Sequence, residues 1–306
     1  MNGWHLTVKK IIKADLMRKL TGISCPLCNR KAGVKVIYDT RGVLNDELPG
    51  LILKCSCCGM TFKEYSKNLS EVYNQEYVDE YKSQEYMNGE NAKIFFDKIL
   101  SGSKYYKFRD KEKIRLLDIG TGTGTLLERA SVSGIEAQGV EQCHGFITIC
   151  RKKGLDVKEG RIEEIQFDRK YHIITMCDVI EHLSLPLASL RKVKELLLPG
   201  GEVIICTPNH NSPIVTFGNS LSFFKINNLA NTIFSGKHVS FFDEASMIYL
   251  LDKTGFSLRK IFCKIYDRPG SEVSFINVAA IQVIETIGRI FGMNGFRMFV
   301  YADINS

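Results

Sequence analysis

The fold is decided by the stretch Ile114-Arg115-Leu116-Leu117-Asp118-Ile119-Gly120-Thr121-Gly122-Thr123-Gly124-Thr125-Leu126-Leu127. Its apolar first half predicts a buried strand, and the residues from Leu126 onward predict the start of a helix. The three glycines between them let the backbone approach a ligand closely, and the free N–H groups of a helix start favour an anionic or carboxylate group. The stretch therefore predicts a binding corner.

The spacing of these glycines is G-x-G-x-G, whereas a dinucleotide site would use G-x-G-x-x-G. Asp118 lies two residues before the first glycine. This combination resembles motif I of the class I S-adenosylmethionine (SAM) methyltransferases; the alternative is an ordinary glycine-rich turn between a strand and a helix. The resemblance assigns the following residues to the SAM pocket: Asp118, Gly120, Thr121, Gly122 and Gly124.

Strand and helix patterns alternate from residue 106 onward, which predicts a parallel sheet with helices on both faces. The expected strands are 114–119, 136–141, 156–159, 171–176 and 203–206, followed by an antiparallel hairpin of 256–266 and 297–304. The expected later helices are 186–198, 244–254 with Asp243 as its cap and Gly255 at its end, and 277–293. Residues 106–306 thus resemble an α/β, Rossmann-like class I methyltransferase domain.

Further cofactor contacts are expected at the ends of the second and third strands. Glu141 lies about 20 residues after the first glycine, where an acid can bind both ribose hydroxyls of a nucleoside; the alternative is a surface glutamate. Gln142 is assigned to the same pocket. In the family the turn after the third strand flanks the adenine ring, often with an Asp where this chain has Arg161, and Ile162 can still pack on the ring.

Candidate catalytic residues follow the fourth strand, at the sheet edge where substrate meets cofactor in this fold class. Cys177 and Asp178 are assigned to the SAM pocket, and Glu181 and His182 to catalysis, because a carboxylate and an imidazole can move protons. His238 joins them as a catalytic candidate, since its segment resembles the family's His-x-x-x-Phe-Ser/Thr. The alternative is that the Glu-His pair only holds the loop.

A metal-dependent alternative uses the same residues. Asp178-x-x-Glu181-His182 with His238 resembles the Glu-x-x-Glu-His site of small-RNA 2′-O-methyltransferases and some quinone-pathway O-methyltransferases, which bind a divalent cation. Here an Asp replaces the first Glu, and its reach is one methylene shorter. We therefore expect an activity that survives EDTA and depends on His182 as a general base.

A separate motif occupies the N-terminal third. Cys25-Pro-Leu-Cys28 and Cys55-Ser-Cys-Cys58 have the spacing that points two pairs of thiolates at one tetrahedral zinc. Strand-like runs at 34–38, 51–54 and 61–63 complete the plan of a zinc ribbon, which this region resembles. The alternatives are a redox pair or unliganded core cysteines. Cys57 is left spare, and four thiolates leave no open position, so the zinc is expected to be structural.

The remaining stretches give the domain boundaries. Residues 1–64 are expected to be the ribbon with a preceding amphipathic helix at 1–20, and 65–105 a tyrosine-rich helical linker or lid. Residues 106–306 are expected to be the methyltransferase domain, with an apolar insertion at 211–236 that covers the acceptor or contacts a partner.

Composition limits the kinds of acceptor and the cellular compartment that we expect. The chain has 306 residues, 44% apolar and 25% charged, with a formal charge of +7 spread along it. No basic tract is present, so nucleic acid is disfavoured as an acceptor. Ten cysteines without a signal-peptide pattern or a long apolar run predict reduced thiols in the cytoplasm and no membrane span. A homodimer is left open.

These observations together predict SAM-dependent transfer of a methyl group to an oxygen or carbon of a small-molecule, glycan or secondary-metabolite acceptor. The expected cofactors are SAM and a structural Zn²⁺. Two alternatives stay open: metal-dependent O-methylation of an RNA 2′-hydroxyl or a quinone-type acceptor, and a non-catalytic SAM-binding protein.

Overall fold

The computed structural model describes residues 22–41, 43, 46–65, 73, 77–79, 90–108, 110, 113–213, 215–216, 234, 236–264, 283–284, 286–288, 290 and 292–304. The expected helix at 1–20 lies outside these residues. Most of the tyrosine-rich stretch, the insertion after 216 and the expected helix at 277–293 also lie outside them. Among the described helices, none has the length and apolar character needed to cross a membrane.

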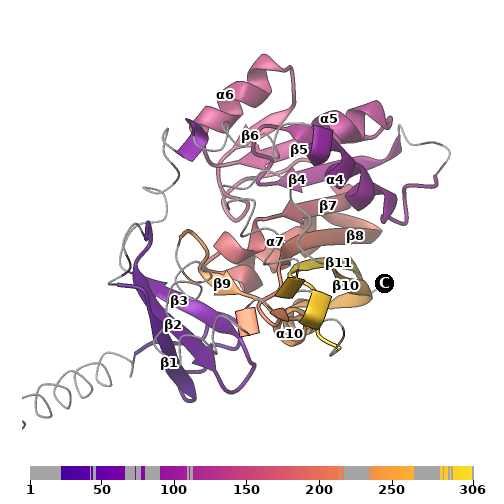
Figure 1. The fold of residues 1–306 in the computed structure, drawn as a ribbon. Coiled ribbons are helices and arrows are strands. Elements are labelled where there is room, and N and C mark those ends of the chain that lie inside the picture. Colours follow the sequence, from indigo (N-terminus) through magenta and orange to yellow (C-terminus); the bar gives the residue numbers. More distant parts are fainter. Residues whose placement is uncertain are drawn as a thin grey trace, which may run out of the picture.

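A seven-stranded sheet forms the centre of the described chain, in the order β10-β11-β8-β7-β4-β5-β6 (Figure 1). Its parallel strands are β4 (Arg115–Ile119), β5 (Glu136–Glu141), β6 (Val157–Glu159), β7 (Tyr171–Cys177) and β8 (Leu197–Pro208). The antiparallel hairpin of β10 (Phe256–Lys264) and β11 (Arg297–Ile304) completes it on the β8 edge. The predicted Rossmann-like sheet and its terminal hairpin are confirmed.

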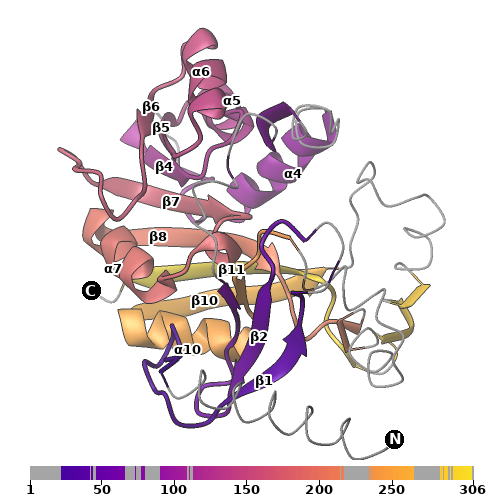
Figure 2. The ribbon, with the colours of Figure 1, turned by 90° about the vertical axis from the view of Figure 1, so that its left-hand side faces the viewer.

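Helices cover both faces of this sheet, as the alternation of the strands requires. On one face Leu116 and Ile173 pack with α4 (Glu90–Ser101) and α5 (Thr125–Val132). On the other, Leu117 and Ile174 pack with α7 (Pro186–Leu196) and α10 (Glu244–Thr254). Figure 2 shows α4 and α7 on opposite sides of the sheet. The remaining helix, α6 (His144–Lys152), leads into β6.

Two helix boundaries illustrate what local signals fix. Asp243 caps α10 through a reciprocal pair of bonds with Ser246, and Gly255 ends it with φ 73°, as predicted. The predicted helix 186–198 instead ends at Leu196, because Leu197 already pairs with Tyr171 in the sheet. β8 is therefore longer than the predicted strand 203–206, and Pro199-Gly200-Gly201 lies inside it.

The ribbon is a second sheet, in the order β1-β2-β3-β9. Its own strands are β1 (Val34–Asp39), β2 (Gly50–Cys55) and β3 (Thr61–Tyr65), close to the predicted runs. The fourth strand, β9 (Ser240–Phe241), comes from the C-terminal half of the chain (Figure 1). Backbone pairing therefore joins the ribbon to the segment between β8 and α10.

The domain boundaries stay predictions, but one helix bears on them. Residues Ile99 and Leu100 of α4 are buried in the same cluster as Leu116 of β4. This helix, which the sequence places in the linker 65–105, packs with the methyltransferase sheet.

Candidate active site

The glycine turn at the end of β4 forms the corner that the sequence predicts. Gly120, Gly122 and Gly124 have φ values of 69°, 55° and 82°, which residues with a Cβ rarely adopt. A Cβ on Gly120 would lie 2.4 Å from Cγ2 of Val179, so glycine is also required for space. α5 begins directly afterwards at Thr125, and its first N–H groups lack partners within the helix.

Glu141, at the end of β5, is bonded to this turn. Its carboxylate accepts hydrogen bonds from the backbone N–H of Gly122 at 3.0 Å and of Gln142 and Cys143 at 2.8 Å. The side chain is buried, and burial raises its pKa while the three N–H groups lower it. Gln142 itself is exposed. The carboxylate thus fixes the glycine turn at the place assigned to the ribose.

Asp118 lies under the turn, with its side chain directed to the neighbouring strand. It accepts a 2.6 Å hydrogen bond from Oγ1 of Thr175 on β7, and burial raises its pKa to about 7. Thr121 is also buried, and its Cγ2 would lie 2.9 Å from a Cβ on Gly139. Asp118 thus links β4 to β7, and Thr121 lies against Gly139 of β5.

The two residues beside the expected adenine site differ in environment. Ile162 is buried at the edge of the core shared by the sheet and α7. Arg161 is half exposed and makes ion pairs with Glu163 and Glu164. The apolar Ile162 is therefore the residue of this turn that is suited to pack on an aromatic base.

The loop after β7 carries the catalytic candidates. Glu181 and His182 lie in the 3₁₀ helix η3 (Ile180–His182). Glu181 is 1% exposed; Oε2 accepts a 2.8 Å hydrogen bond from Thr207, and Oε1 has no partner among the described residues. Burial and the neighbouring Asp178 raise its pKa to about 8. The carboxyl group is thus largely protonated at neutral pH in the absence of a cation.

His182 is held in one tautomer. Its Nδ1 lies 3.1 Å from the carbonyl oxygen of Lys237, which can only accept, so Nδ1 carries the proton and Nε2 keeps a lone pair. The ring of His238 meets it edge-on at 4.8 Å between centroids. Burial lowers the pKa of both imidazoles, so both are neutral at neutral pH. Ligand atoms of Glu181, His182 and His238 lie within 4.8 Å of one another.

Asp178 takes a different position from the one that the metal-dependent alternative gives it. Its backbone is left-handed, with φ 55°, and its carboxylate makes an ion pair with the buried Arg297 of β11. It is not one of the three residues whose ligand atoms gather. Cys177, just before it, ends β7, and burial raises the pKa of its thiol well above the ordinary value.

Several residues at the site carry no sequence signal of their own. Arg297 is 119 residues from Asp178. Tyr73 comes from the tyrosine-rich stretch expected to be a helical linker or lid. Its ring lies 6.2 Å from that of His182, and its buried hydroxyl has no partner among the described residues. His210 follows β8 between Phe234 and Phe241, and its two ring nitrogens are likewise buried without partners in the described part of the chain. Burial lowers its pKa to about 3.

The four predicted zinc ligands also come together. The Sγ atoms of Cys25 and Cys58 are 3.5 Å apart, those of Cys28 and Cys55 are 3.6 Å apart, and all four lie within 4.8 Å. Four thiolates around a tetrahedral zinc would lie about 3.8 Å apart, given Zn–S bonds of about 2.3 Å. Cys57 is exposed and directs its thiol to the carbonyl of Ala32. The cluster is compatible with a zinc ribbon.

Comparisons with known proteins agree with this architecture. The sheet order, the glycine turn and the loop after β7 define a class I methyltransferase fold. The chain belongs to the methyltransferase domain family, whose model matches residues 86–261.

Among curated proteins, the chain is 30% identical over 105 residues to the ubiquinone biosynthesis O-methyltransferase of Bordetella bronchiseptica; the match covers 32% of this chain and 44% of that protein. It is 20% identical over 188 residues to the enzyme of the same name from Rickettsia felis, covering 60% and 76%. The match to the first relative thus spans less than half of that protein's length.

Two solved structures share the fold. A SAM-dependent methyltransferase from Thermotoga maritima gives a TM-score of 0.54 at 17% identity, covering 78% of this chain and 100% of that one. Magnesium protoporphyrin IX methyltransferase from Synechocystis gives 0.53 at 12%, covering 78% and 98%.

Proposed function

We propose that the protein is a SAM-dependent methyltransferase that methylates a hydroxyl group of a small-molecule acceptor. SAM would be held by the glycine turn 120–124, by Glu141 at the ribose and by Ile162 at the adenine, with Asp118, Thr121, Gln142, Cys177 and Asp178 around the pocket. Bound SAM supplies an electrophilic methyl group. The N–H groups at the start of α5, which have no partner within the helix, support this fit.

The observation that carries the proposal is the fixed tautomer of His182. A neutral imidazole with its lone pair on Nε2 can accept the proton of an acceptor hydroxyl as the oxygen attacks the methyl group. His238 packs against this ring and limits its rotation. Most of the acceleration is expected from positioning of the two substrates, with a smaller share from the base.

The test is the loss of the imidazole. His182→Ala is expected to lower kcat about a hundredfold, the usual size of a general-base contribution, while calorimetry shows unchanged affinity for S-adenosylhomocysteine (SAH). Activity in wild-type protein should survive EDTA. A fully active His182→Ala enzyme would leave catalysis to proximity alone.

A second candidate is metal-assisted O-methylation, which the gathering of Glu181, His182 and His238 favours. One carboxylate and two imidazoles suit Mn²⁺ or Fe²⁺ better than Mg²⁺, which prefers oxygen ligands. A bound cation would lower the pKa of the acceptor hydroxyl. Activity that EDTA abolishes and Mn²⁺ restores would favour this candidate over the metal-free one, and SAM binding without turnover on any hydroxylated acceptor would favour a non-catalytic role.

We further propose that one structural zinc is bound by Cys25, Cys28, Cys55 and Cys58. Burial raises the pKa of the Cys25 thiol to about 12, so a cation is needed to keep this sulfur deprotonated. Elemental analysis should give about one zinc per chain. Cys58→Ser should lose it and unfold the ribbon, whereas the control Cys57→Ser should keep it. The reverse result would make Cys57 the ligand.

Three further points remain predictions. They are the identity of the acceptor, a glycan or secondary metabolite included, the cytoplasmic location, and a homodimer. Sedimentation of the purified protein would test the last of these.

A further inference from the structure

The segment 236–241 connects the ribbon to the catalytic loop. On one side its strand β9 completes the ribbon sheet, with Thr61 paired to Phe241 and Phe62 to Ser240. The N–H of Lys63 continues this ladder by donating to the carbonyl of Val239 at 2.8 Å. Figure 1 shows β9 beside β3. Three consecutive ribbon residues therefore set the register of this distant segment.

The other side of the same segment holds the catalytic loop. The N–H of Val239 donates to the carbonyl of Glu181 at 2.8 Å, and Oγ of Ser240 donates to that of Leu183 at 2.9 Å. The carbonyl of Lys237 accepts the bond from Nδ1 of His182. Any displacement of the segment would therefore move the group that selects the His182 tautomer.

A buried ion pair of the ribbon anchors the first residue of the segment. Nζ of Lys63 donates to the carbonyl of Gly236 at 3.1 Å, and the carboxylate of Asp46 accepts the N–H of Gly236 at 2.8 Å. Lys63 Nζ and Asp46 Oδ2 are 3.6 Å apart, and both side chains are fully buried. The carbonyl of Leu48 accepts a further hydrogen bond from Lys63 Nζ, and the N–H of Leu48 donates to the carboxylate of Asp46. Both backbone polar groups of Gly236 are thus bound by ribbon charges.

Stability alone is a weak reason for this arrangement. Taking two charges out of water costs several kcal/mol per ion, and well-packed apolar residues often replace such pairs without loss. Beside it, a second cross-bridge joins Lys237 to Glu47 at 3.0 Å, so the next residue of the segment is also tied to the ribbon. The hydrogen bonds that Lys63 and Asp46 make with Gly236 fix the position of this backbone. Apolar side chains in their place would make no such bonds.

We propose that Lys63, with Asp46, is a positioning residue for the catalytic histidine: it locks Gly236 so that the carbonyl of Lys237 stays in place and holds His182 with its proton on Nδ1. The proposal rests on the proposed role of His182 as the base. The ribbon thereby acts on catalysis through the 236–241 segment.

The experiment measures the tautomer directly in the full-length protein. Two-bond ¹H–¹⁵N spectra of histidine-labelled protein distinguish an Nδ1–H imidazole from an Nε2–H one, and a His182→Asn sample assigns the His182 signals. Wild-type protein is expected to show His182 as Nδ1–H. In Lys63→Met the pattern should shift to a mixture with Nε2–H, while SAH affinity by calorimetry stays within about twofold, since the glycine turn is untouched.

Leu53→Ala is the matched control. Leu53 is a fully buried ribbon residue of β2, and its truncation should lower the urea midpoint of unfolding without removing a bond to Gly236. The proposal requires its His182 pattern to stay that of the wild type. An unchanged tautomer in Lys63→Met, or an equal shift in Leu53→Ala, would overturn it.

A variant that fails to fold does not end the test. Asp46→Asn/Lys63→Met removes the unpaired carboxylate that the single change leaves buried and should fold better. The His182 tautomer is then measured in this double variant. A shift toward Nε2–H supports the proposal, and an unchanged tautomer overturns it. The result is also separable from the proposed function. If wild-type protein binds no SAH, the methyltransferase proposal fails, while the His182 spectrum still decides whether Lys63 positions the ring.

Discussion

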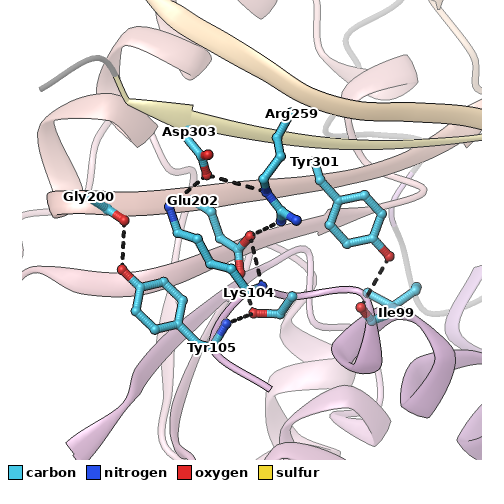
Figure 3. Close-up of polar contacts among 9 residues, drawn as sticks. Ile99, Lys104, Tyr105, Gly200, Glu202, Arg259, Tyr301 and Asp303 are labelled. Carbon is cyan, nitrogen blue, oxygen red and sulfur yellow. Dashed lines mark hydrogen bonds and ion pairs between the residues drawn. The ribbon is translucent and has the colours of Figure 1, made fainter. Parts of the chain in front are cut away.

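Two buried glutamates, Glu202 on β8 and Glu181 in η3, have different surroundings. Glu202 lies level with Ile173, near the amino ends of the parallel strands, and Glu181 lies against Thr207 at their carboxyl ends. Figure 3 shows Glu202 beside Lys104 and Arg259. Its Oε1 accepts a hydrogen bond from Ser103, and its Oε2 accepts hydrogen bonds from the backbone N–H of Lys104 and from Arg259. Glu181 has one bonded oxygen and one without a partner in the described part of the chain.

The two carboxyl groups differ in how completely they are hydrogen-bonded within the described part of the chain. Burial raises the pKa of both carboxyl groups, so a shifted pKa alone does not distinguish them. The Glu202 network ties the end of α4 to β8, β10 and β11, and Tyr105 adds a bond to the carbonyl of Gly200 (Figure 3). At the carboxyl ends, buried polar atoms of Glu181, His210 and Tyr73 have no hydrogen-bond partner among the described residues, and a bound ligand could supply one.

The largest expected effect is on SAM binding, from a substitution in the glycine turn at the carboxyl ends of the parallel strands. Gly122→Val should weaken SAM binding at least a hundredfold, because a Cβ is added at φ 55° in the turn that approaches the ligand. Gly154→Val is the control, since its φ of 72° brings similar strain and its Cβ would meet nothing within 4 Å. Calorimetry with SAM on both folded variants is the measurement. Equal affinities for SAM in the two would remove the turn from the cofactor site.

Exchanging each glutamate for glutamine tests the comparison itself. Glu202→Gln should lower the free energy of unfolding by about 2 kcal/mol, since the charge-assisted bond from the partly exposed Arg259 is weakened, and leave kcat unchanged. Glu181→Gln should have little effect on stability, because the carboxyl group is already largely protonated and the amide oxygen can accept the same bond from Thr207. It should lower kcat roughly tenfold, because an amide cannot exchange a proton with a ligand. Urea titration and steady-state kinetics measure the two. A loss of activity in Glu202→Gln at full stability would contradict the division.

The smallest effect concerns pH and His210. Folding keeps this imidazole neutral down to a pKa of about 3, against an ordinary value of 6.5. The unfolded chain therefore binds more protons below pH 6.5, and the stability from the neutral group is lost as the pH falls from 6.5 toward 3. In wild-type protein this loss in the free energy of unfolding amounts to about 2 kcal/mol between pH 6.5 and pH 5. It should disappear in His210→Phe. Urea midpoints at the two pH values measure it.

His144→Phe serves as the control for this pH experiment, because the His144 side chain is 75% exposed. Its stability should still fall between pH 6.5 and pH 5, because the buried His210 is unchanged in this variant. A His210→Phe protein that still loses stability like the wild type would show that His210 is solvated or already bonded in solution.

Sequence alone determined the elements whose signals are local. The run from Ile114 to Leu127 specifies strand, turn and helix within 14 adjacent residues, and each C-x-x-C pair lies within one turn. The alternation of strand-like and helix-like segments after residue 106 predicted the parallel sheet, because a connection between parallel strands normally carries a helix that packs on the sheet. The same local reasoning placed the α10 cap at Asp243.

Only the tertiary structure decided which distant groups meet. Arg297 takes Asp178 away from the cluster of Glu181, His182 and His238, and Lys63 binds Gly236, 173 residues later in the chain. No spacing rule reports such pairs, because they arise from strand order and from the joining of β3 to β9. A pattern along the chain registers neighbours a few residues apart, whereas a buried charge pairs with whichever group the fold brings within reach.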